Sequence, residues 1–490
     1  MKKEVMEMFV DGQWIESETG ETFESISPAT GETIATLPLG SQRDAQKAVQ
    51  AARRDQPELA KMTAFERGEL CHRIAEEIEN ERDSLTCWLA MDQGKPYKTE
   101  ARLEVDQTIR HFKEAAEDVT RLETPVLQSR DPHKRIFLIR QPRGVYGVIT
   151  PWNFPLAIPV EYLSAALATG NAVVWNPAST TSAIAVKLAE CLERALQRDG
   201  VPPGVFNLVT GKGSVVGDTL VTSEGVDAIG LTGSPEVGEQ VARRAGLKNL
   251  LLELGGNGPV IVLDDADVEE AAKAIAFGAF YCAGQVCVAS ERILVHEAVY
   301  DEFIDHLVEE TCKVKLGPSL DEETTMGPLN NSEVADKMDR HIQDAVEKGA
   351  KVIYGGERAP GFPTDLYYQP TVLVDVPRDS LVNREETFGP IAPVMTFKSY
   401  EEALEITNEI DLGLLASVFT SSLKNAFYFS EKIQTGAVNI NETSDYWEIH
   451  TPVGGYSGKK SGIGRIGGRW TIEEMTQLKT ISMDIAKVKG

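Results

Sequence analysis

Short apolar runs alternate with amphipathic stretches along much of the chain, which predicts alternating strands and helices. Thr63 and Glu66 form a capping box before Leu70, Ile74 and Ile78, whose four-residue spacing places them on one helix face. Residues 41–44 (SQRD) give the same start signal before an alanine-rich stretch. We expect both helices to lie on the surface of a sheet.

The alternation becomes regular from Tyr146 onward. Strands are expected at 144–150, 172–177, 205–211 and 227–233, with helices at 181–198 and 235–245. A second region begins at the strand 259–263 and includes helices at 265–280 and 300–314 and strands at 291–296 and 417–420. Because strands that alternate with helices of ten or more residues favour a parallel sheet, we expect two α/β regions.

Two further segments, 122–140 and 471–490, have strand character with no obvious helix beside them. Exposed strands of this kind often pair with another subunit. We therefore predict a homo-oligomer, and the sequence leaves a dimer and a tetramer equally open.

Composition excludes several classes of function. The 490 residues suffice for two or three domains, and 49 basic against 75 acidic residues give a net charge of -26, which disfavours nucleic acid and anionic membranes as partners. The N-terminal residues lack the apolar run of a signal peptide, so we expect a cytoplasmic location. Six cysteines without a CxxC pair indicate reduced thiols, with neither a disulfide framework nor a metal site.

Cys287 is the candidate nucleophile, in the stretch GQVCVASER. A nucleophilic cysteine needs a lowered pKa or a nearby base, and donors for the oxyanion that develops. Cys282 lies five residues away and stays a second candidate. The other cysteines lie in helical stretches that suit small core residues: Cys71, Cys87, Cys191 and Cys312.

Three other motifs offer complementary chemistry, each with a plain structural alternative. Gly233 and Ser234 end a strand just before a helix, where backbone N–H groups can hold a pyrophosphate, although the three-glycine fingerprint is absent. Asn153 in TPWNFP can donate to an oxyanion or simply bond its own turn. Glu253 in LLELGGNGP is either a desolvated general base or a buried acid satisfied by backbone donors.

Taken in order, the motifs resemble those of the NAD(P)-dependent aldehyde dehydrogenase superfamily. The resemblance runs from VDGQW through PWNFP, LTGSPEVG, LELGGNGP, GQVC, EETFGP and SGIGR to the last strand. It implies an α/β fold with a Rossmann-type cofactor-binding domain (1–120 and 142–254), a second α/β catalytic domain (255–452) and a small β oligomerisation arm (121–141 and 470–490).

The resemblance also implies a mechanism. Cys287 attacks the aldehyde to give a thiohemiacetal, whose oxyanion is held by Asn153 and the Cys287 backbone N–H. Hydride transfer to NAD or NADP leaves a thioester, and Glu253 activates the water that hydrolyses it to a carboxylic acid. These steps need a soft nucleophile, fixed donors and a base.

The cofactor residues implied by the resemblance lie in four segments. They are Ile149, Thr150, Pro151 and Trp152 along the nucleotide, Gly233 and Ser234 at the pyrophosphate, Glu386 and Phe388 at the nicotinamide, and Asn176 and Ser179 at the adenosine ribose. At the last site this chain departs from the family. Asn176 replaces a usual lysine, which disfavours NADP, and Ser179 replaces the glutamate of NAD-preferring members, which favours it, so the preference stays open.

The substrate residues implied by the resemblance are Phe112, Glu161, Val286, Val288, Trp447, Ile449 and His450. Glu161 stands where many members carry an aromatic or basic residue, and Pro452-Val453 stands where Pro-Phe is usual. If Glu161 lines the tunnel, it disfavours aldehydes that bear a carboxylate. The alternative is that Glu161 is paired inside the fold and never meets substrate.

Two other functions compete with hydrolytic aldehyde oxidation. Relatives that transfer the acyl group to coenzyme A generally lack the base glutamate, so Glu253 favours hydrolysis. A binding or structural protein that has lost turnover would have no need of Cys287, Glu253 and Asn153 together.

Overall fold

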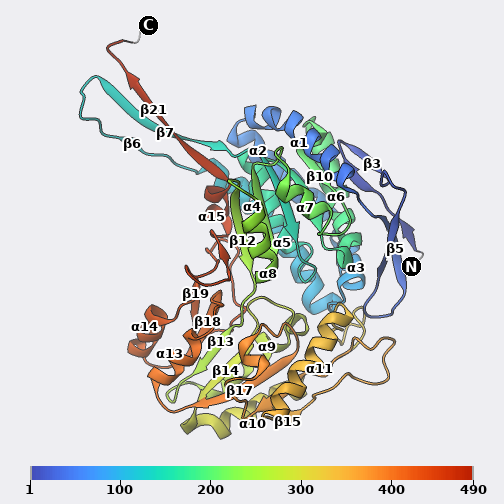
Figure 1. The fold of residues 1–490 in the computed structure, drawn as a ribbon, viewed down its shortest axis with the longest axis vertical. Helices are drawn as coiled ribbons and strands as arrows, with labels where there is room; N and C mark the ends of the chain where they lie inside the picture. The colour runs from blue at the N-terminus through green and yellow to red at the C-terminus, as the bar shows by residue number, and fades with distance from the viewer. Residues whose placement is uncertain (1–2, 488–490) are drawn as a thin grey trace.

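The structure, a computed structural model, describes residues 3–487 (Figure 1). Its larger sheet has eight strands in the order β20-β12-β11-β8-β9-β10-β2-β3. Strands β8 to β12 run parallel, while β20 and the pair β2 and β3 join antiparallel at the two edges. The strands are β2 (Met8–Val10), β3 (Gln13–Ile15), β8 (Val145–Thr150), β9 (Ala172–Pro177), β10 (Phe206–Leu208), β11 (Ala228–Gly233), β12 (Asn249–Leu254) and β20 (Gly462–Ile463).

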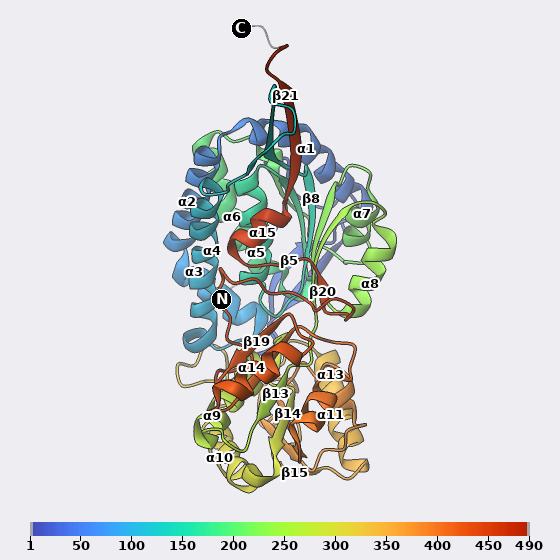
Figure 2. The ribbon, with the colours of Figure 1, turned by 90° about the vertical axis from the view of Figure 1, so that its left-hand side faces the viewer.

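Helices cover both sides of this sheet (Figure 2). The two expected capping boxes are confirmed at α1 (Gln42–Lys61) and α2 (Ala64–Asn80), where Ser41 and Thr63 accept from Asp44 and Glu66. The stripe of Leu70, Ile74 and Ile78 is fully buried. The other helices of this layer include α4 (Arg102–Thr120), α5 (Ala157–Thr169), α6 (Ser182–Asp199), α7 (Val216–Thr222) and α8 (Pro235–Arg244).

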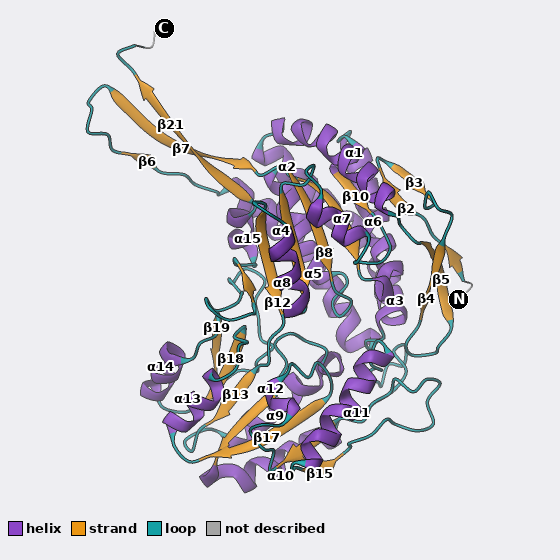
Figure 3. Ribbon diagram, in the orientation of Figure 1, coloured by secondary structure: helices purple, strands orange, loops and turns teal. Residues whose placement is uncertain are grey.

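The second sheet has seven strands, in the order β15-β16-β17-β14-β13-β18-β19, and only its edge strand β15 is antiparallel. The expected helices at 265–280 and 300–314 are confirmed as α9 (Val268–Phe280) and α10 (Tyr300–Cys312). The strands are β13 (Pro259–Val262), β14 (Arg292–His296), β15 (Lys351–Tyr354), β16 (Thr371–Val374), β17 (Ile391–Phe397), β18 (Leu415–Phe419) and β19 (Ala437–Ile440), packed with α11 (Ser332–Glu347), α13 (Tyr400–Asn408) and α14 (Leu423–Lys432). Figure 3 shows the two sheets as separate layers of strands, each with its own helices.

A three-stranded antiparallel arm projects from the larger layer (Figure 1). It consists of β6 (Val126–Leu127), β7 (Lys134–Pro142) and β21 (Thr476–Asp484). The segment expected to be a strand at 471–490 differs at its start, where residues up to Glu474 belong to α15 (Gly468–Glu474). Thr471 and Ile472 are buried there against the core, which explains the helix, and residues 488–490 lie outside the described part of the chain.

A second small sheet near the N-terminus joins β1 (Glu4–Val5), β5 (Thr33–Pro38) and β4 (Thr22–Ile26). Among residues 3–487, no helix has both the length and the apolar character needed to cross a bilayer. The chain passes from the larger to the smaller layer between Leu254, the end of β12, and Pro259, the start of β13. This crossing brings the carboxyl ends of the first sheet's strands against the loops of the second.

Candidate active site

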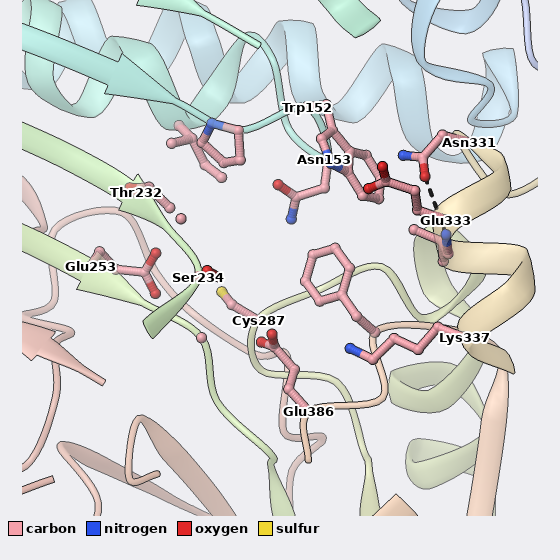
Figure 4. Close-up of a pocket in the computed structure, with 16 residues that line it drawn as sticks. Trp152, Asn153, Thr232, Ser234, Glu253, Cys287, Asn331, Glu333, Lys337 and Glu386 are labelled. Atoms are coloured by element: carbon pink, nitrogen blue, oxygen red, sulfur yellow. Dashed lines mark hydrogen bonds between the residues drawn. The ribbon is translucent and has the colours of Figure 1, made fainter. Parts of the chain in front are cut away.

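A cavity of about 330 Å³ lies at this crossing (Figure 4). Its walls are the carboxyl ends of β8, β11 and β12, the Cys287 loop, the start of α11 and the loop at Glu386. The carboxyl ends of parallel strands are the usual place for a ligand site in α/β folds. The expected site residues that line the cavity are Pro151, Trp152, Asn153, Gly233, Ser234, Glu253, Cys287, Glu386 and Phe388.

Two glycines after β12 allow the Cys287 loop and Glu386 to approach the chain closely. A Cβ on Gly256 would lie 2.4 Å from the carbonyl oxygen of Cys287, and a Cβ on Gly255 would lie 2.5 Å from Glu386 Oε1. The N–H of Gly256 donates to the same carboxylate at 3.1 Å. Glycine is therefore required where the chain leaves β12, because any side chain would push the Cys287 loop and Glu386 away.

Cys287 is partly exposed on the floor of the cavity and follows a strained turn. Cys282 and Ala283 in that turn adopt left-handed backbone conformations, with φ of 52° and 53°. Burial raises the pKa of the Cys287 thiol well above its usual value, and the Glu253 carboxylate raises it further. The thiol is therefore protonated at neutral pH, and a nucleophilic role requires a base beside it.

The carboxyl group of Glu253 can serve as the base beside the Cys287 thiol. It is 4% exposed at the end of β12 and faces Cys287 across the cavity (Figure 4). Burial raises the pKa of Glu253 to about 8, although the neighbouring Cys287 thiol opposes the rise. A carboxyl group that titrates near neutral pH can accept and release a proton within one catalytic cycle.

Asn153 is held by partners on both its side chain and its backbone. Its amide Nδ2 donates to the carbonyl of Gln285 at 3.0 Å, two residues before Cys287. An amide nitrogen carries two N–H groups, so a second donor remains for a ligand oxygen. The backbone carbonyl of Asn153 accepts from Lys95 Nζ at 2.9 Å, and Lys95 is paired at 2.5 Å with Glu104 in a fully buried ion pair.

The start of α8 suits a pyrophosphate. Ser234 is the N-cap of this helix, and its hydroxyl accepts from Val237 N–H at 3.3 Å. Gly233 lines the cavity, and a Cβ there would meet only Leu231, at 3.8 Å, so this wall is open to a ligand. The unpaired N–H groups of a helix start favour an anion, and the cavity therefore fits a dinucleotide at this end.

An aromatic pair closes the opposite wall. The rings of Trp152 and Phe388 lie 5.5 Å apart and perpendicular to each other. Phe388 has a positive φ of 58°. Its N–H and that of Thr387 donate to the buried carboxylate of Glu291, at 2.5 and 2.9 Å, which fixes the loop that carries Glu386.

The expected adenosine residues lie beyond this cavity and are bonded to the protein. Asn176 donates to the carbonyls of Val209 and Gly211 at 3.0 and 3.4 Å, and Ser179 donates to Gly211 at 3.4 Å. Thr150 accepts from Trp175 Nε1 at 2.9 Å. A Cβ on Gly217 would lie 3.3 Å from both Ile149 and Asn176, so the glycine allows α7 to approach the strand ends.

The expected substrate residues are dispersed. Val286 and Val288 are buried in an apolar cluster against which Cys287 and Trp447 pack. Ile449 is buried, whereas His450 is exposed beside Glu448. Two residues lie elsewhere: Phe112 has no exposed surface and belongs to the core of the larger layer, and Glu161 lines a separate small cavity with His111.

One wall of the cavity, formed by α11, was not predicted from the sequence. Asn331, Glu333, Val334 and Lys337 line it, and Figure 4 shows Lys337 directed toward the cavity near Glu386. The only local signal is the N-cap, where Asn331 accepts from the N–H of Val334 at 3.2 Å. A cap marks the start of a helix but does not say which site the helix faces.

A thiol and a buried carboxyl group beside a helix start that suits an anion define the class, an α/β oxidoreductase that uses a dinucleotide. Residues 14–481 match the model of the aldehyde dehydrogenase family, and the chain belongs to that family. It is 38% identical to a lactaldehyde dehydrogenase of Methanocaldococcus jannaschii, over 97% of this chain and 99% of the relative.

Solved structures of related enzymes have the same fold. An NADP-dependent enzyme of E. coli superposes with a TM-score of 0.94 at 35% identity, covering 98% of both chains. An NAD-dependent aldehyde dehydrogenase from Sinorhizobium meliloti gives 0.94 at 35% identity, covering 100% of this chain and 96% of the other. The expected fold and family are confirmed, and the protein is an oxidoreductase that oxidises aldehydes with NAD or NADP.

Proposed function

We propose that the protein oxidises an aldehyde to a free carboxylic acid, with Cys287 as nucleophile, Glu253 as general base and Asn153 as oxyanion donor. The observation that carries the proposal is that the Cys287 thiol and the buried carboxyl group of Glu253 line the same cavity and face each other across it (Figure 4). The free amide N–H of Asn153 on the same cavity supplies the third element.

Each group has a separate task in this proposal. Glu253 takes the thiol proton, the thiolate attacks the aldehyde carbon, and the N–H groups of Asn153 and Cys287 stabilise the oxyanion. NAD or NADP, when bound, accepts the hydride of this adduct. Glu253 then takes a proton from water, the hydroxide displaces Cys287 from the thioester, and the carboxylate product leaves.

The residues that line the cavity support a set of contacts with the cofactor. Gly233 and Ser234 hold the pyrophosphate at the start of α8, and Glu386 and Phe388 hold the nicotinamide ribose and ring. Lys337 faces the same region and joins them. The nucleotide runs on past the β8 and β9 ends, along Ile149, Thr150, Pro151 and Trp152 to Asn176 and Ser179.

On the substrate side, the carbon chain of the aldehyde meets Val286, Val288, Trp447 and Ile449. The apolar cluster that packs around Cys287 supports this assignment. Apolar walls beside the nucleophile exclude bulk water, which strengthens the hydrogen bonds to the oxyanion.

Water, not coenzyme A, is the acyl acceptor in this proposal, because Glu253 is poised to activate it. Glu253→Gln tests the point in a rapid-mixing experiment that follows reduced nicotinamide. We expect a slowed first turnover, because the thiol has lost its base, followed by still slower later turnovers and a trapped acyl-enzyme detectable by mass, with no acceleration by coenzyme A. Glu236→Gln, on the start of α8, is the control. Wild-type steady-state turnover of Glu253→Gln would remove Glu253 from the mechanism.

We also propose that the arm of β6, β7 and β21 pairs with a second copy of the chain, as a homodimer or homotetramer. Its exposed apolar side chains support this: Val126, Leu127, Leu478 and Met483. A sedimentation experiment that finds only the 53.6 kDa species would contradict it. A nucleophilic thiol also has to stay reduced, which supports a cytoplasmic location.

A further inference from the structure

A wide groove lies where the three-stranded arm joins the larger layer. Figure 1 shows the arm leaving this layer beside α2. The groove has a volume of about 790 Å³ and is lined mainly by α1, α2, the arm strands β7 and β21, and the turn before β8. It shares no lining residue with the cavity that holds Cys287, so the mechanism above gives it no task.

The groove is basic, although the chain as a whole is acidic. As far as the structure describes the chain, its charged lining residues are all cations: Arg53, Lys61, Arg67, Arg140 and Arg143. The whole chain has a net charge of -26, so this surface contrasts with the average of the molecule. Positive charge gathered in a hollow concentrates anions there.

Two of these cations have no acidic partner. The other three pair with carboxylates outside the groove: Arg53 with Asp227, Lys61 with Glu58 and Arg140 with Glu473. Among residues 3–487, Arg67 and Arg143 form no ion pair. The guanidinium of Arg67 donates to the carbonyls of Ala168 and Met62 instead. That of Arg143 donates to the carbonyl of Glu474 at 2.6 Å, so two positive charges lack a counter-charge.

The surplus of charge has an energetic cost. Arg67 is half-buried, and burial lowers the pKa of its guanidinium. Because arginine keeps its charge in proteins, this desolvation destabilises the fold unless an anion compensates it. Arg140 is only partly compensated, since Glu473 lies 3.5 Å from it and 2.7 Å from Arg469. The groove is therefore short of negative charge.

The two unpaired arginines flank one turn, Gly170 and Asn171, at the end of α5. A Cβ on Gly170 would lie 3.7 Å from Arg67 Cζ, which places the guanidinium directly beside this turn. On the other side, the N–H of Gly144 donates to Asn171 Oδ1 at 2.9 Å, and Gly144 follows Arg143 in the chain. Both arginines thus border the same stretch of the groove.

We propose that the groove binds a phosphate group between Arg67 and Arg143, either as free phosphate or at the end of a small organic molecule. A phosphate group carries about 1.5 to 2 negative charges at neutral pH and three acceptor oxygens. It therefore matches two uncompensated guanidinium groups, each of which can bond two oxygens. A carboxylate would leave one of the two charges without a partner. The site shares no residue and no step with the catalytic proposal.

Apolar side chains offer a further contact to an organic molecule. They are Met62, Val119, Leu122 and Ile139. A bound phosphate would also join α2, in the larger layer, to Arg143, where the chain passes from the arm strand β7 to β8. Because it binds only the folded chain, it should raise the melting temperature.

The test is a calorimetric titration of the full-length protein with inorganic phosphate and with phenyl phosphate. Saturating NAD or NADP fills the pyrophosphate position at Ser234, and chloride at equal ionic strength is the ion control. We expect wild type to bind, and Arg67→Met and Arg143→Met to bind at least about tenfold more weakly, as for loss of a charged hydrogen-bond donor. Arg110→Met, an exposed arginine of α4 outside the groove, should bind like wild type.

The two probes distinguish the sources of the phosphate group. Tighter binding of phenyl phosphate would assign the site to a phosphorylated organic molecule, and equal binding would assign it to free phosphate. Either probe should raise the melting temperature of wild type and leave that of Arg143→Met unchanged, while chloride should have no effect on either protein.

Three results would overturn the inference. Wild type that binds neither probe would do so, and so would equal affinity of wild type and both arginine variants. The third is loss of the oligomer in Arg143→Met without phosphate binding by wild type, since acidic side chains of a second copy would then fill the groove. If Arg67→Met does not fold, Arg143→Met decides the question. Binding is measured without turnover, so a failure of the catalytic mechanism leaves this result readable.

Discussion

Lys95 donates a hydrogen bond of 2.9 Å to the backbone carbonyl of Asn153, from a position with no solvent exposure of its side chain. Its partner Glu104 accepts from the N–H groups of Leu156 and Ala157 at the start of α5. One buried ion pair thus fixes the backbone on both sides of the turn that carries Asn153. The amide can point at the oxyanion only while this turn is held.

Lys95→Met should therefore lower activity and stability together. Removal of one partner of a buried ion pair costs about 3–5 kcal/mol, because the other charge stays buried and unpaired. We expect kcat/KM to fall at least about tenfold, as for a displaced oxyanion donor. Thermal melting and steady-state kinetics check both effects, with the exposed Lys98→Met as control. An unchanged kcat/KM in Lys95→Met would show that Asn153 needs no such support.

Buried carboxyl groups couple stability to pH. Burial raises the pKa of Glu253 and Glu291 to about 8 and that of Glu386 to about 7, from an ordinary value of 4.5. Between these values the native protein binds more protons than the unfolded chain, so stability falls as pH rises from about 5 to 8. Melting temperatures across this range measure the trend, and Glu253→Gln should make it shallower. A melting temperature that rises with pH would contradict the pKa directions.

Gly256→Ala should damage the site without affecting the distant arm. The new Cβ would lie 2.4 Å from the Cys287 carbonyl oxygen, so the loop of the nucleophile has to move. We expect a loss of kcat of at least about tenfold, since small displacements of reacting groups are costly. Gly213→Ala, where a Cβ would meet nothing within 4 Å, is the control. Equal activity of the two variants would show that the close crossing is unimportant.

The sequence predicted those site residues that sit at the ends of regular elements. Gly233 and Glu253 lie at the carboxyl ends of apolar strands and Asn153 lies shortly after one, and parallel strands bring their carboxyl ends to one edge. The family resemblance implied that they meet Cys287, and all four residues line the cavity.

Residues whose partners are distant in sequence could not be found in this way. Lys337 lies on an ordinary capped helix, and only the tertiary fold turns it toward the cavity. The pairing of Lys95 with Glu104 and the approach of His111 to Glu161 likewise depend on how α4 and α5 pack. The residues of α15 were expected to form a strand. Ile472 is buried in this helix, and a local sequence pattern does not reveal such burial.

The central claim is that Cys287 is the nucleophile. Its most direct test is the absorbance of reduced nicotinamide with purified wild type, Cys287→Ala and Cys282→Ala, with a panel of aldehydes and either NAD or NADP. We expect aldehyde-dependent reduction by wild type, none by Cys287→Ala, and retained activity in Cys282→Ala. Turnover by Cys287→Ala at the wild-type rate would contradict the account.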